Sequence, residues 1–157
     1  MKKNGFTIIE ILVAIAVIIA VFTAILGFFA FEVRIAERGR MRLKAVSFTE
    51  EAMEAVRNFR DNTTWEESAG ISGLTTGIDY HSESSAIGWN IVLGNETIGE
   101  FTRAIVFDEV YRDINHNISG SGTKDENTRK VAITVSWTDR QGSTEESLVT
   151  YITNWRE

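Results

Sequence analysis

The sequence predicts an α+β protein in which one long N-terminal helix packs on an antiparallel β-sheet meander. Three observations support this prediction: an uninterrupted apolar run near the N-terminus, a second stretch with apolar residues at helical spacing, and several later segments with strand-like alternation. The chain of 157 residues contains no proline, so nothing kinks a long helix by the usual route. We expect a single helix from about Phe6 to Arg60, roughly 80 Å long at 1.5 Å per residue.

The apolar run from Ile11 to Phe31 is long enough to cross a membrane. It reads ILVAIAVIIAVFTAILGFFAF and contains no charged residue. About 20 apolar residues span the hydrocarbon core of a bilayer. A secretory signal peptide has a shorter apolar region, followed by small residues at its cleavage site. The sequence therefore predicts a retained transmembrane helix.

The continuation of the helix, residues 32–60, is amphipathic. Its apolar residues recur at helical spacing and form one stripe. The stripe consists of Val46, Thr49, Met53, Val56 and Phe59. This stripe is the expected cover for one face of the sheet.

Five later segments are predicted as strands. Residues 131–137 (VAITVSW) alternate with period two, which places Val131, Ile133, Val135 and Trp137 on one face. The other expected strands are residues 78–81, 89–93, 101–111 and 148–152. Short turns between consecutive strands favour an antiparallel meander with one buried face.

The N-terminus resembles the class III leader of bacterial type IV pilins and type II secretion pseudopilins. Residues 5–10 read GFTIIE, with Lys2 and Lys3 before them and the apolar helix after them. The resemblance implies that prepilin peptidase cuts after Gly5 and that the new N-terminal Phe6 is methylated. It also implies that Glu10 is the glutamate of the family, used in assembly. The implied division is a leader at 1-5, a transmembrane or filament-core helix at 6-31, its amphipathic continuation at 32-61 and a β-rich globular domain at 62-157.

Glu10 needs a physical reason, because an ionised carboxylate in hydrocarbon costs several kcal/mol unless it is paired. In a filament of packed helices, Glu10 of one subunit can neutralise the Phe6 amine of a neighbour and set the axial register. The alternative is that Glu10 lies near the membrane interface and reaches water.

The resemblance also implies location and partners. The expected partners are other pilin or pseudopilin subunits through the N-terminal helix, prepilin peptidase, an inner-membrane assembly platform, and membrane lipid before assembly. The family keeps the N-terminus in the cytoplasm and the globular domain outside, in the inner membrane first and then in a periplasmic pseudopilus or cell-surface pilus. The positive-inside rule alone favours the opposite orientation, because five basic residues between Arg34 and Lys44 outnumber Lys2 and Lys3.

Two further functional readings remain open. Residues 51–65 (EAMEAVRNFRDNTTW) resemble a stretch of minor pilins related to pilus-modification proteins, which favours a minor pilin or pseudopilin. The alternative is a single-pass membrane-anchored β-domain binding module that does not polymerise, which would have no need of Glu10.

The amphipathic part of the helix carries a basic patch followed by an acidic patch. In a filament, staggered subunits could pair the basic patch of one chain with the acidic patch of another. The alternatives are that lipid headgroups contact the basic patch and that solvent covers the acidic patch. The patches are Arg38, Arg40, Arg42 and Lys44, and Glu50, Glu51 and Glu54.

Composition excludes several activities. A net charge of −6 argues against nucleic-acid binding. The chain has no cysteine, which removes disulfides, thiolate nucleophiles and cysteine-based metal sites. The sequence offers no nucleophile-base pair, phosphate loop or metal cluster, so an enzyme is not expected.

One loop begins like a calcium site, and otherwise no cofactor is expected. Oxygen ligands alternate at residues 113–117, but Ile118 and Lys124 stand where such a loop requires glycine and glutamate. The alternative is a polar hairpin loop joining Tyr111 to Lys130. The candidate ligands are Asp113, Asn115, Asn117 and Asp125.

The remaining candidates are aromatic. The histidines, His81 and His116, are predicted to lie in separate surface loops. The tryptophans are expected to pack in the core or on the sheet more often than to form a sugar-binding surface. They are Trp65, Trp89, Trp137 and Trp155.

Overall fold

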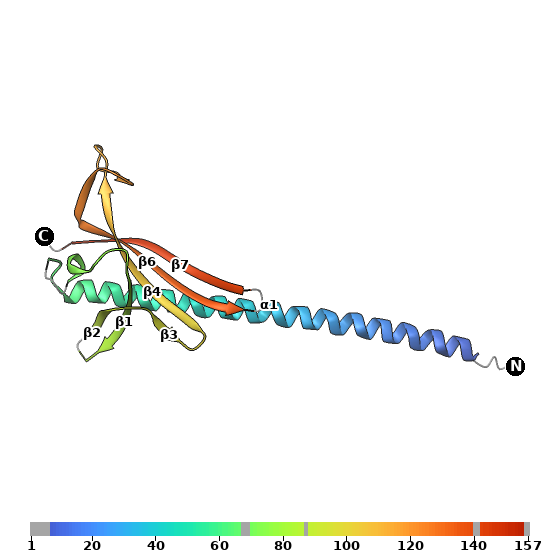
Figure 1. Cartoon of the computed structure of the whole chain (residues 1–157). Coiled ribbons are helices and arrows are strands. Elements are labelled where there is room, and N and C mark those ends of the chain that lie inside the picture. The colour runs from blue at the N-terminus through green and yellow to red at the C-terminus, as the bar shows by residue number, and fades with distance from the viewer. Residues whose placement is uncertain (1–6, 67–69, 87, 140–141, 156–157) are drawn as a thin grey trace. The chain divides into compact units, whose positions relative to one another are not determined.

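A single helix, α1 (Ile8–Asn62), begins the described part of the chain. The computed structural model describes residues 7–66, 70–86, 88–139 and 142–155 (Figure 1). The predicted helix is confirmed within these residues, and its expected start at Phe6 lies outside them. The chain divides into two compact units, Met1–Met41 and Arg42–Glu157.

The second unit contains a seven-stranded antiparallel sheet. Its main path runs β2-β1-β4-β6-β7, and β3 and β5 pair with β4 off this path. The strands are β1 (Asp79–Ser85), β2 (Gly88–Leu93), β3 (Glu96–Ile98), β4 (Phe101–Arg112), β5 (Ile118–Ser119), β6 (Thr123–Asp139) and β7 (Gly142–Thr153). All five expected strands are present, and β4, β6 and β7 form the predicted meander. The earlier strands depart from it, because β1 pairs with both β2 and β4.

Two strands and a short helix were not predicted from the sequence. β3 and β5 contain only three and two residues, too few for a period to appear. The connection after α1 contains a 3-10 helix, η1 (Ile71–Gly73). His81, which was expected both at the end of a strand at residues 78–81 and in a surface loop, lies within β1, which continues to Ser85.

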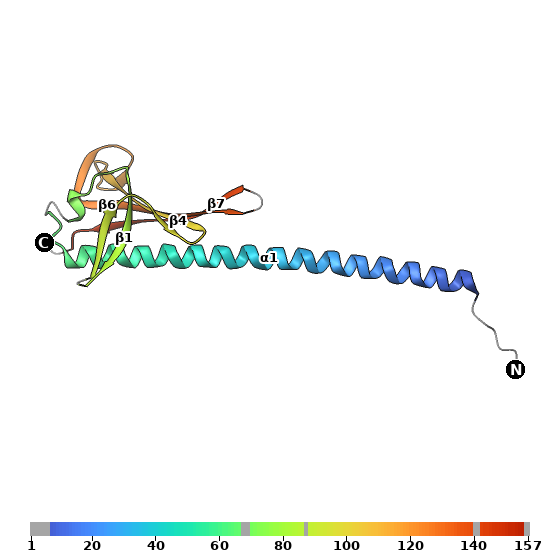
Figure 2. The same cartoon turned by 60° about the horizontal axis from the view of Figure 1, so that its bottom comes forward.

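The part of α1 in the second unit, from Arg42 onward, lies along one face of the sheet (Figures 1 and 2). Four of the five predicted stripe residues are buried there, whereas Val46 is only half-buried. Three fully buried alanines, Ala45, Ala52 and Ala55, widen the stripe. The sequence did not single them out, because alanine occurs on any helix face. Their short side chains let the helix backbone approach the sheet.

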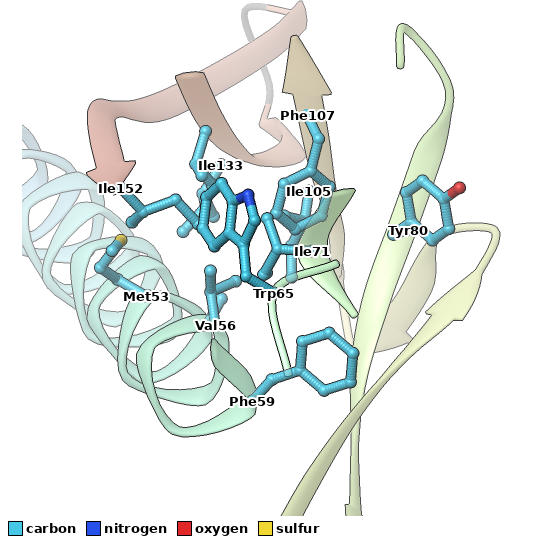
Figure 3. Close-up of a cluster of buried hydrophobic side chains, with 12 residues drawn as sticks. Met53, Val56, Phe59, Trp65, Ile71, Tyr80, Ile105, Phe107, Ile133 and Ile152 are labelled. Atoms are coloured by element: carbon cyan, nitrogen blue, oxygen red, sulfur yellow. The ribbon is translucent and has the colours of Figure 1, made fainter. Parts of the chain in front are cut away.

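The main hydrophobic core joins this helix face to the sheet and to the connecting segment (Figure 3). The predicted alternation in β6 is confirmed, since Val131, Ile133 and Val135 are fully buried and Trp137 is 6% exposed. Trp65 and Ile71 enter the core from the connection after α1. The other members of this core are Ala52, Met53, Val56, Phe59, Tyr80, Ile105, Phe107 and Ile152.

The ends of β4 and β6 form an arm beyond a bulge at Glu109 and Val110. Pairing continues from Val110 with Asp125 to Arg112 with Thr123. The polar loop expected between Tyr111 and Lys130 is therefore shorter than predicted. Gly122 closes this turn with a φ of +138°, and a Cβ there would clash with the Arg112 carbonyl oxygen, so only glycine fits.

Candidate assembly site on the N-terminal helix

Residues 11–31 of α1, in the first unit, are apolar around the whole circumference of the helix. Every side chain from Ile8 to Arg40 is exposed, including large ones such as Phe22, Leu26 and Phe29. The segment is long and apolar enough to cross a membrane. A helix that is hydrophobic on all sides is buried in lipid or among other helices in its working state.

Thr23 is the polar side chain within this run, and it is satisfied locally. Its hydroxyl donates to the carbonyl oxygen of Ile19 over 2.8 Å. A threonine that bonds back to the preceding turn in this way exposes little hydrogen-bonding capacity to an apolar environment. The run from Ile11 to Phe31 thus presents no unpaired polar side chain.

Glu10 lies in the first turn of α1, directly before the apolar run. Its backbone N–H donates to the carbonyl oxygen of Thr7 over 3.1 Å, and its side chain is exposed. Among the described residues, no ion pair involves its carboxylate. A negative charge is favourable at a helix N-terminus, where the backbone N–H groups have no intrahelical acceptor.

The remaining predicted processing residues lie outside the described part of the chain. They are Lys2, Lys3, Gly5 and Phe6. Cleavage after Gly5 and methylation of Phe6 therefore stay predictions at the level of single residues.

The charged patches along α1 have partners within the chain. Arg42 pairs with Glu146 of β7 over 2.9 Å, and Glu51 lies 3.5 Å from Arg103 of β4. Glu54 approaches Arg57 on the same helix, at 3.9 Å. These contacts involve three of the seven residues predicted to pair between subunits. Pairing of the two patches between subunits stays a prediction.

A buried arginine, which the sequence reasoning did not single out, connects the helix to the sheet. Arg103 is 1% exposed and lies on the helix-facing side of β4, between buried Phe101 and Ile105. Its Nη2 donates to Glu96 Oε2 over 2.6 Å and to the Ser82 hydroxyl over 3.2 Å. Arg103 could have been identified from the sequence, because it is a charged residue at an inward position of a strand whose apolar residues alternate.

The same guanidinium reaches α1. Nη1 of Arg103 donates to the backbone carbonyl of Phe48 over 3.1 Å and lies 3.5 Å from Glu51 Oε1. A buried charge is tolerated only when it is paired and hydrogen-bonded. Arg103 therefore ties the helix, β1 and β3 to one point on β4.

The predicted calcium ligands have other roles in the structure. Asp113 Oδ1 accepts the backbone N–H groups of Asn115 and Asn117 over 2.8 and 2.9 Å, and the bond from Asn117 is the main cause that lowers the pKa of Asp113. Asp125 Oδ2 accepts from Arg112 Nε over 2.6 Å. Within the described residues, no three acidic, histidine or cysteine side chains gather as metal ligands. Calcium binding stays a prediction.

A hydrogen-bonded network stabilises the arm instead. The Tyr111 hydroxyl donates to Glu109 Oε2 over 2.7 Å, and Lys124 lies 3.0 Å from the other Glu109 oxygen. The bond from Tyr111, followed by that from Lys124, lowers the pKa of Glu109. The same contact raises the pKa of Tyr111.

The tryptophans divide into core and surface residues. Trp65 and Trp137 are each 6% exposed, Trp89 is half-buried and Trp155 is 60% exposed. The indole N–H of Trp155 donates to Asp61 Oδ1 over 3.2 Å, at the end of α1. His116 lies in the turn of the arm with a φ of +63°, as predicted for a loop.

Comparison with known proteins identifies the N-terminus. Residues 1–26 match the family model of the prokaryotic N-terminal methylation motif, a range that contains Gly5, Phe6 and Glu10. No curated protein and no solved structure matches the chain. The motif is that of proteins processed by prepilin peptidase. The chain thus carries the prokaryotic N-terminal methylation motif ahead of one long helix and an antiparallel sheet, an α+β arrangement that is consistent with the pilin fold.

Proposed function

We propose that this chain is a minor pilin or pseudopilin, a structural subunit of a type IV pilus or a type II secretion pseudopilus. The observation that carries the proposal is the apolar helix surface from Ile11 to Phe31, exposed on all sides and headed by the carboxylate of Glu10. Family members with this motif are structural subunits, and no enzymatic activity is proposed.

The helix surface accounts for two states of the subunit. Before assembly, lipid covers the apolar residues, because about 20 of them match the thickness of the hydrocarbon core. In a filament, the helices of neighbouring subunits cover the same residues. The transfer exposes no apolar surface to water, so the hydrophobic effect does not oppose assembly.

Glu10 accounts for the register of the subunits. Cleavage after Gly5 creates a cationic amine at Phe6, and an unpaired carboxylate in an apolar environment costs several kcal/mol. Pairing Glu10 of one subunit with the Phe6 amine of the next neutralises both charges. A subunit that is displaced along the axis leaves both charges unpaired, and this penalty selects one register.

The preference for a minor pilin or pseudopilin rests on the sequence. Residues 51–65 resemble minor pilins, and the chain lacks the cysteine pair and the helix-kinking proline of many major pilins. We propose that the N-terminus faces the cytoplasm and the β-rich domain lies outside the inner membrane. The assembly partners are other pilins or pseudopilins and an inner-membrane platform.

The experiment compares Glu10→Gln with Glu32→Gln, a control on the same helix beyond the apolar run. Each variant is expressed in the native host, and the amount of the chain is measured in sheared filaments and in membranes. Glu10→Gln should be processed and retained in the membrane but nearly absent from filaments, whereas Glu32→Gln should be incorporated normally. Incorporation of Glu10→Gln at the unmodified level would refute the assembly role.

A further inference from the structure

Exposed arginines lie on α1 directly beyond the apolar run, within the first unit. They are Arg34, Arg38 and Arg40. Arg34 and Arg38 are at the i,i+4 spacing and therefore lie on the same face of the helix; they are called the arginine pair below. Two like charges at this spacing repel each other and destabilise a helix slightly. An anion bound between them would remove this penalty.

The structure places no acidic partner on the arginine pair. Among the described residues, no ion pair involves Arg34, Arg38 or Arg40. Two acidic residues, Glu32 and Glu37, are near in sequence and also exposed. Side chains at the i,i+2 spacing do not face each other on a helix, so Glu32 does not face Arg34. Glu37 lies at the i,i+3 spacing from Arg34 and offsets one positive charge at most, so the arginine pair keeps a net positive charge.

The arginine pair lies at the depth of the lipid headgroups when the apolar run spans a bilayer. The hydrocarbon core is about 30 Å thick and the whole bilayer about 40–45 Å, so each headgroup layer is about 5–8 Å deep. At 1.5 Å per residue, Arg34 lies about 4.5 Å and Arg38 about 10 Å beyond Phe31. Side chains on a helix point toward its N-terminus, which here is the direction of the membrane. The long side chain of Arg38 therefore reaches back into the headgroup layer.

The chemistry of the headgroup layer matches the arginine pair. A guanidinium group is planar and binds two phosphate oxygens at once, and it loses its hydration more easily than an ammonium group does. A zwitterionic headgroup carries its own cation, which the second arginine repels. A headgroup with a net negative charge has no such cation, so the arginine pair favours anionic phospholipids.

We propose that Arg34 and Arg38 bind the phosphate of an anionic phospholipid headgroup and thereby fix the depth of the helix in the membrane before assembly. The inference rests on the membrane-inserted state of the proposed function. A bound headgroup also compensates for cations that the positive-inside rule draws to the cytoplasmic side. It thus lowers the electrostatic cost of the proposed orientation.

The test measures lipid selectivity of the full chain reconstituted in phosphatidylcholine bilayers. Trace amounts of spin-labelled phosphatidylglycerol or phosphatidylcholine are added, and electron paramagnetic resonance separates lipid at the protein surface from bulk lipid. The label samples every lipid around the helix, so we expect an average preference of about 2-fold for phosphatidylglycerol. The preference should decrease when salt is raised from about 50 mM to about 500 mM. Equal association of the two labels would refute the proposal.

Two double variants locate the preference. Arg34→Gln with Arg38→Gln should remove at least half of it. Arg57→Gln with Lys130→Gln removes the same charge from exposed or half-buried positions of the second unit and should retain all of it. The leader lysines are present in every variant and contribute equally. Circular dichroism confirms that each variant is folded. An undiminished preference in the variant of the arginine pair would place the lipid contact elsewhere and overturn the proposal.

The outcome is separable from that of the proposed function, because these bilayers contain no filament and no assembly partner. Equal association of the two labels would refute headgroup binding and leave the effect of Glu10→Gln on filaments as expected. Normal incorporation of Glu10→Gln would refute the assembly role and leave the lipid preference as expected.

Discussion

Removing the charge of Glu96 is expected to destabilise the second unit more than removing Arg103 itself. Arg103 is 1% exposed, whereas the side chains of its carboxylate partners Glu96 and Glu51 are 33% and 47% exposed. In Glu96→Gln the buried guanidinium loses the negative charge at 2.6 Å and keeps only a neutral amide oxygen as acceptor there. In Arg103→Met both carboxylates can turn to water, and an apolar side chain of similar length occupies the buried position.

The magnitudes follow from this asymmetry. A hydrogen bond to a charged group contributes about 1.5–3 kcal/mol, and a buried charge that loses its partner costs about 3–5 kcal/mol. Glu51 still lies 3.5 Å from Arg103 and offsets part of this loss. We therefore expect Glu96→Gln to lower the free energy of unfolding by about 2–4 kcal/mol. Replacing a buried ion pair by apolar groups is often nearly neutral, so Arg103→Met should cost less than about 1.5 kcal/mol.

The assay is urea unfolding of the full chain in micelles, followed by the fluorescence of the buried tryptophans. Urea is uncharged and does not screen the ion pairs, unlike guanidinium chloride. Glu100→Gln is the matched control, because Glu100 is exposed next to β4 and forms no ion pair with the described residues; its cost should be below about 0.5 kcal/mol. If Arg103→Met is destabilised more than Glu96→Gln, the explanation by an uncompensated buried charge is wrong.

Three further outcomes test the core, the arm and the calcium prediction. Ile133→Ala, at a fully buried position, should lower the free energy of unfolding by about 2–5 kcal/mol in the same urea assay, and a loss under about 1 kcal/mol would contradict the packing of this face. Tyr111→Phe should raise the pKa of Glu109 toward its ordinary value of 4.5 in a carboxyl NMR titration, because the phenol bond is the main cause of the lowered pKa. Because the pKa of Glu109 is lower in the folded state, its ionisation stabilises the fold above pH 4.5, and this stabilisation is lost as the pH falls through the folded-state pKa. The Tyr111→Phe variant should therefore lose less stability on acidification than the unmodified chain. An unchanged pKa of Glu109 in the variant would contradict the contact with Tyr111. Because Asp113 already accepts backbone N–H groups, millimolar calcium should leave the melting temperature at its value with chelator, and a clear rise would instead establish the predicted site.

The elements with a long period were predictable from the sequence. The apolar run and the stripe that follows it predicted α1, and the alternation of residues 131–137 predicted the buried face of β6. Periodicity identifies such elements because each turn of helix or pair of strand residues repeats the same environment. β3 and β5 are too short to repeat anything, and their pairing depends on where β4 already lies.

The contacts between distant residues were not predictable in the same way. The alternation of residues 101–107 would have placed Arg103 inward, although the sequence reasoning did not single it out, and only the fold brings Glu96, Ser82 and the Phe48 carbonyl around it. Likewise, Trp155 and Asp61 are far apart in the sequence, and only the fold brings the Trp155 indole N–H to 3.2 Å from Asp61 Oδ1. Among the assembly residues, Glu10 is notable because a carboxylate beside an apolar run is costly unless paired, whereas its role in assembly was implied by the resemblance to pilin leaders.

The central claim is that the chain is a processed pilin or pseudopilin subunit, and mass spectrometry of its N-terminus tests this most directly. The protein is purified from membranes of a host with prepilin peptidase, and its N-terminal peptide is sequenced by fragmentation. The expected product begins at Phe6 and carries one added methyl group on its amine. A membrane-embedded protein that retains Met1 to Gly5 in the presence of active peptidase would contradict the claim.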